Sequence, residues 1–238
     1  MCKMEGSCRL NLKKLGIHKE KIFLILRHGL LARLQVYVFS FSKVLIQLSI
    51  NSFGSVAMAG SSAAGNVEGF IITAMNSFQQ TALCFTSQNL GGGKYERISK
   101  VLRNSLLMVS FVGIMMGCGC YLFGEELLSI YFSDSEVISY GSNRFKWIGI
   151  PYFLRGIMDV LMGMLRGLGY AVVPMFVSII GVCGFRILWI ATVFAQFHSL
   201  DVLFSSYVIS WTLTGGTQLL CFIVVWRGLK KQLTKHFI

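Results

Sequence analysis

The 238-residue chain is 54% apolar, has charged side chains at only 13% of its positions, and has a mean hydropathy of +0.65. This is too hydrophobic for an ordinary soluble domain and is typical of a polytopic membrane protein. The net charge of +12 comes from cations that lie between apolar segments rather than on one soluble face. It therefore indicates membrane topology and does not predict a nucleic-acid partner.

Motifs of enzymes and metal sites are absent from the sequence. The seven cysteines lie mostly inside apolar runs and show no CxxC or paired Cys/His spacing. No nucleophile elbow, phosphate loop or HExxH occurs, and no cleavable signal peptide is expected at the basic start. We therefore expect no enzyme, no metal site and no cofactor.

The chain begins with a basic segment, residues 1–21, which we expect on the cytoplasmic membrane surface. A first membrane span is predicted over residues 22–50. It is interrupted by Arg27, Arg33 and Lys43, and each cation costs about 2.5–3.5 kcal/mol near a bilayer centre. This span therefore needs neighbouring helices that accommodate its charges.

The next stretch, residues 61–93, is long enough to cross a bilayer but has Glu68 near its middle. On a helical wheel at about 100° per residue, one narrow arc is polar and the opposite face is apolar. The polar arc holds Ser61, Gly65, Glu68, Asn76, Gln79 and Thr86, with Ser62, Gly69, Gln80 and Ser87 beside it. The apolar face holds Val67, Phe70, Ile71, Ala74, Phe78 and Phe85.

We expect the apolar face of this second span to meet lipid, and the polar arc to face other helices or a wet cavity. Glu68 is then the leading candidate for a functional carboxylate. The structural alternative is a protonated Glu68 that only hydrogen-bonds neighbouring helices. Gly91, Gly92 and Gly93 predict the end of the span, because glycine favours helix termini.

An uncharged run over residues 104–124 predicts a third span, and it is followed by the only acidic loop, with Glu125, Glu126, Asp134 and Glu136. A fourth span is predicted over residues 145–165. Arg155 and Asp159 lie four residues apart there and share one helical face with Tyr152. We expect Arg155 and Asp159 to form an intrahelical ion pair.

A fifth span over residues 170–196 has Pro174 in its first turns, and we expect its Arg186 to extend to the membrane surface. A sixth span, residues 202–226, has no charge. Six spans place both termini on one side, and the loops rich in Lys and Arg make that side cytoplasmic. The predicted architecture is all-α: a transmembrane lobe of six helices over residues 22–228, followed by a basic cytoplasmic tail over 229–238.

Three stretches carry a family resemblance: FSFSKVLIQLSINSFGSVAMAG (39–60), NVEGFIITAMNSFQQTALCFTSQNLGGGKYERI (66–98) and FLRGIMDVLMGMLRGLGYAVVPMFVSIIGVCGFRILWI (153–190). They resemble the carboxy-terminal half of multidrug and toxic compound extrusion (MATE) transporters, near the NorM-like and DinF-like bacterial members. The resemblance implies one lobe of a plasma-membrane protein in which two six-helix lobes surround a cavity. In that family, cationic drugs leave in exchange for H⁺ or Na⁺.

Some residues of this chain match the sequence pattern of the family, and others depart from it. Glu68 matches the NxEGF stretch of the DinF-like type, and Asp159 matches an acid on the fourth span of this lobe. Leu31 stands where the family has a helix-starting proline, and Phe39 stands near the position of an acid in NorM-like members. These two departures affect the ion site that the resemblance implies.

The leading hypothesis is a half-transporter that exchanges organic cations for H⁺ or Na⁺ by alternating access, together with an amino-terminal lobe or a second copy of itself. Its predicted binding residues are Glu68, Asn76, Gln79, Gln80, Tyr152, Arg155 and Asp159. The expected partners are the lipid bilayer and small drug cations. Two alternatives stay open: a truncated membrane fragment that transports nothing, and a flippase for lipid-linked sugars from the same superfamily.

Overall fold

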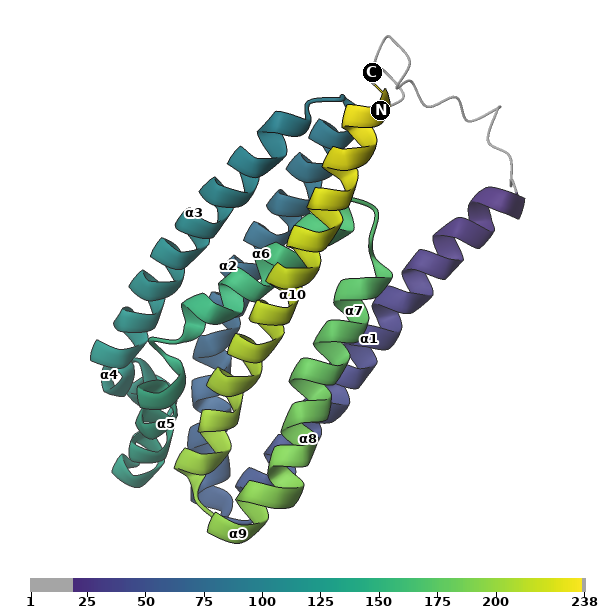
Figure 1. Ribbon diagram of the computed structural model, residues 1–238. Coiled ribbons are helices and arrows are strands. Elements are labelled where there is room, and N and C mark those ends of the chain that lie inside the picture. The colour runs from purple at the N-terminus through teal and green to yellow at the C-terminus, as the bar shows by residue number, and fades with distance from the viewer. Residues whose placement is uncertain (1–18, 237–238) are drawn as a thin grey trace, which may run out of the picture.

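The computed structural model describes residues 19–236, with the side chains of residues 22, 23 and 35–231. These residues are mostly helical and form no strand, which confirms the all-α prediction (Figure 1). Most of the predicted basic segment 1–21, the last two residues of the tail, and the side chains of Arg27, Leu31 and Arg33 lie outside this description.

The elements follow one another with short connections. In chain order they are α1 (Lys19–Asn51), α2 (Ser55–Gly91), α3 (Tyr95–Leu122), α4 (Gly124–Ser129), α5 (Ser135–Ile148), α6 (Tyr152–Gly167), α7 (Val172–Ser178), the π-helical η2 (Ile179–Gly184), α8 (Phe185–Trp189), the π-helical η3 (Ile190–Phe194), α9 (Ala195–Phe197) and α10 (Leu200–His236). The segments from α7 to α9 form one run of helix over residues 172–197. The predicted second span ends as expected, because α2 stops at Gly91 and Gly93 has a positive φ.

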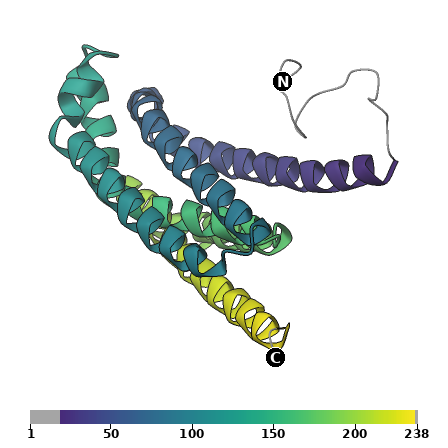
Figure 2. The same ribbon diagram turned by 90° about the horizontal axis from the view of Figure 1, so that it is seen from above.

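Successive long helices alternate in direction along one bundle, as Figures 1 and 2 show. The start of α1, the α2–α3 and α6–α7 connections and the end of α10 share one end of the bundle. Cations occur in the elements at that end: Lys94 and Arg97 belong to the α2–α3 connection and the start of α3, and Arg227 belongs to the last turns of α10. Glu125 and Glu126 belong to α4, which lies toward the other end. This arrangement agrees with the predicted loop pattern, and the cellular side of each end stays a prediction.

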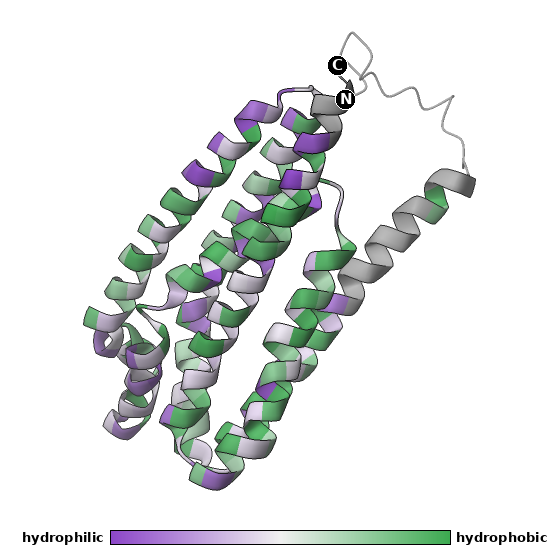
Figure 3. Cartoon of the chain, in the orientation of Figure 1, coloured by the Kyte–Doolittle hydropathy of each residue, from purple (hydrophilic) through white to green (hydrophobic). Residues whose placement is uncertain are grey.

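Three helical runs are long and apolar enough to cross a membrane: residues 95–122, 172–197 and 200–231. The pair α5 and α6 qualifies as a fourth if it counts as one broken span. Figure 3 shows hydrophobic residues along α3 and α10 and hydrophilic residues toward the ends of the bundle. The long helices α1 and α2 do not reach this apolarity within the described residues, so the six-span prediction stands without direct confirmation.

The predicted fourth span over 145–165 is wrong as a single helix. The structure has two helices there, α5 and α6, which meet at a bend of 56°. Pro151 immediately precedes α6; it lacks a backbone N–H and disfavours helical geometry in the residue before it, so the helix breaks. Residues 135–144, which the sequence placed outside any span, belong to α5.

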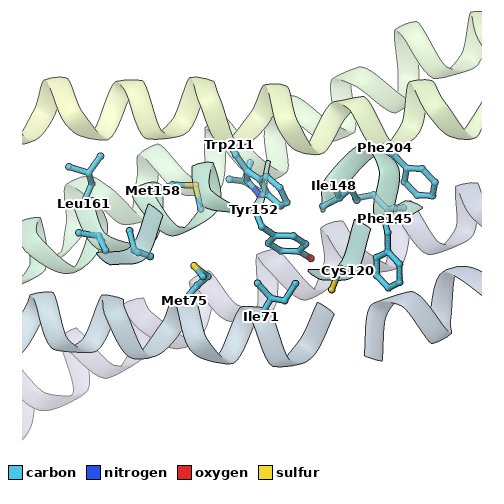
Figure 4. Close-up of a cluster of buried hydrophobic side chains, with 14 of the residues drawn as sticks. Ile71, Met75, Cys120, Phe145, Ile148, Tyr152, Met158, Leu161, Phe204 and Trp211 are labelled. Carbon is cyan, nitrogen blue, oxygen red and sulfur yellow. The ribbon is translucent and has the colours of Figure 1, made fainter. Parts of the chain in front are cut away.

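The predicted lipid-facing side of α2 is only partly correct. Phe70 and Phe85 are exposed as expected, but Val67 and Ile71 are buried in the main core cluster. Their burial follows from the packing of α2 on α5 and α6, its most extensive neighbours. Figure 4 shows Ile71 within this core, beneath Tyr152 of α6 and Trp211 of α10.

The helix α6 lies at the centre of the lobe, with α2, α3 and α10 packed around it. Glycines allow its backbone to approach α2 closely. A Cβ at Gly163 would overlap the carbonyl group of Gln79, and a Cβ at Gly167 would contact the backbone of Leu83. Without water between them, membrane helices associate through such close van der Waals contact of small residues.

We predict that Gly163→Ala destabilises the lobe by about 1–3 kcal/mol, because the added methyl group forces α6 away from α2. The measurement is the melting temperature of the purified protein in detergent. Gly69→Ala is the matched control, since a Cβ there meets nothing within 4 Å. Equal melting temperatures for the two variants would contradict the close α2–α6 packing.

Candidate functional site

A cavity of about 650 Å³ lies among the helices of the lobe. Its lining comes mainly from α1, α2 and α6, with single or paired residues from α5, η2, α8 and α10. The charged residues of the lining are Lys43, Glu68, Arg144, Arg155, Asp159, Arg166 and Arg186. Lining residues on α1 and α2, among them Ser40 and Asn66, remain exposed, so the cavity opens to the outside between these two helices.

The structure brings six of the seven predicted site residues together at this cavity. They are Glu68, Asn76, Gln79, Tyr152, Arg155 and Asp159. Gln80 is exposed on α2 and does not line the cavity, because it is turned about 100° from Gln79 on the helix. The polar arc predicted for the second span therefore corresponds to a cavity wall along Ser61, Gly65, Glu68, Asn76 and Gln79.

The buried carboxylate of Glu68 is bound by an arginine that the sequence analysis missed. Arg144 Nε donates to Glu68 Oε1 at 2.6 Å, and Arg144 Nη2 donates to Glu68 Oε2 at 2.7 Å. Arg144 Nη1 also donates to Ser61 Oγ at 2.7 Å. Glu68 is 4% exposed and Arg144 is 8% exposed, so this is a bidentate ion pair inside the lobe.

The sequence does contain a signal for Arg144. The buried positions of α5 are Val137, Gly141, Ser142, Arg144, Phe145 and Ile148. Their spacing of three and four residues places Arg144 on the core face of a helix. The sequence analysis missed this pattern because its fourth span begins at residue 145, which leaves Arg144 in a loop.

The predicted ion pair between Arg155 and Asp159 is confirmed. Arg155 Nε lies 3.5 Å from Asp159 Oδ2 on the same face of α6. Asp159 is 5% exposed, and its Oδ2 accepts no aligned hydrogen bond from a described residue. Compared with the carboxylate of Glu68, this acid has one longer ion-pair contact, lines the cavity, and has Arg166 as a second nearby positive charge.

The prediction that Arg186 extends to the membrane surface is wrong. Its side chain is 5% exposed and lines the cavity. Its guanidinium lies 3.9 Å above the Tyr207 ring, and its Nε donates to Ser210 Oγ at 3.1 Å. Because Arg186 lies midway along the helical run 172–197, a ring and a hydroxyl of α10 are closer partners than either end of the bundle.

Positive charge exceeds negative charge around the cavity. Both acids of the lining, Glu68 and Asp159, are already paired with arginines. The described side chains form no ion pair with Lys43, Arg166 or Arg186. Arg166 instead donates to the side-chain oxygen of Gln35 on α1, which joins α6 to α1 across the cavity.

Comparison with known proteins agrees with this fold. The MatE family model matches residues 32–192, well over half of the chain. The chain belongs to the MatE family. In the crystal structure of the Vibrio cholerae MATE transporter VcmN in its bent form, the match covers 89% of this chain and 48% of that one, with a TM-score of 0.79 and 18% sequence identity.

Two curated relatives are described as probable multidrug resistance proteins. YoeA of Bacillus subtilis (strain 168) is 24% identical over 190 residues, which cover 79% of this MatE chain and 41% of YoeA. NorM of Thermotoga maritima is 26% identical over 179 residues, which cover 75% of this chain and 38% of NorM. The chain thus spans about half the length of the relatives it matches, as expected for one lobe.

We predict that Arg144→Gln and Glu68→Gln each destabilise the protein by about 3–5 kcal/mol, because either change leaves a buried group without its charged partner. The double variant should lose much less than the sum, since no unpaired charge remains. Thermal unfolding in detergent measures all three. Arg103→Gln, at an exposed position on α3, should change stability little, and strictly additive losses at 68 and 144 would contradict the ion pair.

Proposed function

We propose that this six-helix unit is one lobe of a multidrug exporter that works by alternating access in the plasma membrane. The support comes from the MatE membership, from the cavity between the helices, and from its opening between α1 and α2. A second lobe, from the same polypeptide, a separate chain or a second copy, would cover that opening. Rocking of the two lobes would then expose the cavity to each side in turn.

The carboxylate that exchanges its ligand in this proposal is Asp159. We choose Asp159 because the two buried acids differ in how tightly arginine binds them. Glu68 accepts two short hydrogen bonds from Arg144, whereas Asp159 has one ion-pair contact at 3.5 Å and an Oδ2 without a hydrogen-bond donor among the described residues. A loosely held acid can take up H⁺ or Na⁺ and release it when an organic cation arrives.

The remaining predicted residues act as lining in this proposal. Asn76 and Gln79 of α2 offer amide groups to a cargo, and Tyr152 forms an aromatic surface with Trp211, whose ring centroid lies 5.4 Å away. Glu68 serves as a structural clamp rather than as the ion site. With the cation-rich end of the bundle in the cytoplasm, both termini would also be cytoplasmic.

We predict that Asp159→Asn abolishes ethidium efflux from bacteria that lack their own pumps and produce this chain with its facing lobe. The amide keeps the size of the side chain but cannot exchange a proton or a cation. Fluorescence of ethidium-loaded cells after energisation measures the rate, and collapse of the H⁺ or the Na⁺ gradient identifies the coupling ion. Glu125→Gln, at an exposed position on α4, should export normally; equal efflux from Asp159→Asn would refute this role.

A further inference from the structure

Some residues of the cavity lining have a buried hydrogen-bond donor that finds no acceptor among the described residues. Arg186 is 5% exposed, and its Nη2 has no hydrogen-bond partner among the described residues. The same holds for Nε1 of Trp211, which is 2% exposed, and for Nε2 of Gln47. A buried donor without an acceptor costs free energy, so a native site with several of them calls for an explanation.

These donors belong to one region. The guanidinium of Arg186 lies 6.0 Å from the Trp211 ring centroid, and both side chains line the cavity together with Gln47. Lys43 lies one helical turn before Gln47 on the same face of α1 and lines the cavity with an exposed side chain. Arg155, Arg144 and Arg186 repel its charge, and Glu68 attracts it. Three helical segments, α1, α8 and α10, thus place donors and positive charge around one cavity, and the three donor atoms themselves are covered by neighbouring atoms.

Neither carboxylate of the lining forms an ion pair with Arg186 or Lys43, although Glu68 attracts the charge of Lys43. Glu68 is bound by Arg144 and Asp159 by Arg155. Tyr207 and Ser210 satisfy only part of the hydrogen-bonding capacity of the Arg186 guanidinium, through a ring contact and one hydrogen bond. A buried guanidinium that keeps an unpaired N–H can form a strong, charge-assisted hydrogen bond with an anionic oxygen.

We propose that Arg186, Trp211, Gln47 and Lys43 form a subsite for an anionic oxygen group of the cargo, a carboxylate or a phosphate. This rests on the proposed function, because it takes the cavity as the cargo site. Arg186 and Lys43 supply the positive charge, while the indole and amide N–H groups orient the oxygens. A cargo with both charges would place its cation near Asp159 and its anionic group near Arg186.

A matched pair of dyes tests the subsite. Rhodamine B and its ethyl ester share one cationic ring system, and only rhodamine B has a free carboxylate. Fluorescence anisotropy of each dye, titrated with the purified full chain in phosphatidylcholine nanodiscs and corrected with empty nanodiscs, gives the two affinities. We expect rhodamine B to bind about tenfold or more tightly, the effect of one charge-assisted hydrogen bond.

Substitutions test which residues cause the tighter binding of rhodamine B. Arg186→Gln should remove the carboxylate advantage, and Trp211→Phe, which keeps the aromatic packing, should reduce it. Arg103→Gln removes the same charge from an exposed position on α3 and should leave the advantage intact. If Arg186 served only to hold α8 against Tyr207, its replacement would lower the melting temperature without changing the dye preference, and the proposal would be overturned.

Competitors identify the source of the anionic group. Displacement of rhodamine B by sodium benzoate would indicate a soluble organic anion, and displacement by lysophosphatidylglycerol alone would indicate a lipid headgroup; either result supports the subsite. Equal affinities for the two dyes, or no displacement by either competitor, would refute it. Because binding is measured on this chain alone, a carboxylate advantage without efflux would refute only the proposed transport, and efflux without the advantage only the subsite.

Discussion

The ion pair between Glu68 and Arg144 is the interaction on which the arrangement of the lobe depends. It joins the middle of α2 to the last turns of α5, with two short hydrogen bonds and both side chains buried. Burying either charge alone costs several kcal/mol, so each residue needs the other. The third contact, to Ser61 Oγ, holds the arginine about two helical turns before Glu68 on α2 and so fixes the register of the two helices.

The break between α5 and α6 follows from the same arrangement. In a straight helix over residues 135–167, Arg144 and Gly163 would lie about 28 Å apart along the axis, whereas their contacts on α2, Glu68 and Gln79, lie only about 16 Å apart. A straight helix along α2 therefore does not fit both contacts. The bend of 56° before Pro151 lets α5 make the contact with Glu68 and α6 make the contact with Gln79. The first half of the broken span then supplies the clamp, and the second half supplies Tyr152, Arg155 and Asp159 to the cavity.

This division gives the two acids of the lobe different physical environments. The carboxylate of Glu68 accepts one short hydrogen bond on each oxygen, whereas Asp159 has one longer contact with Arg155. Elsewhere in the cavity, Arg186 and Lys43 have no carboxylate partner among the described residues. If Asp159 is the exchangeable acid that we propose, the two environments together suit a cargo that presents both a cation and an anionic group.

The sequence by itself determined the class of protein, the approximate positions of five of the six predicted long helices, the end of α2 at its glycines and the pairing of Arg155 with Asp159. These follow from composition and from spacing along one helix, which are local properties. Only the tertiary structure decided the partner of Glu68, the burial of Val67 and Ile71, and the inward position of Arg186. Each of these depends on which helix lies opposite, and helical periodicity fixes which residues share a face but not what that face meets.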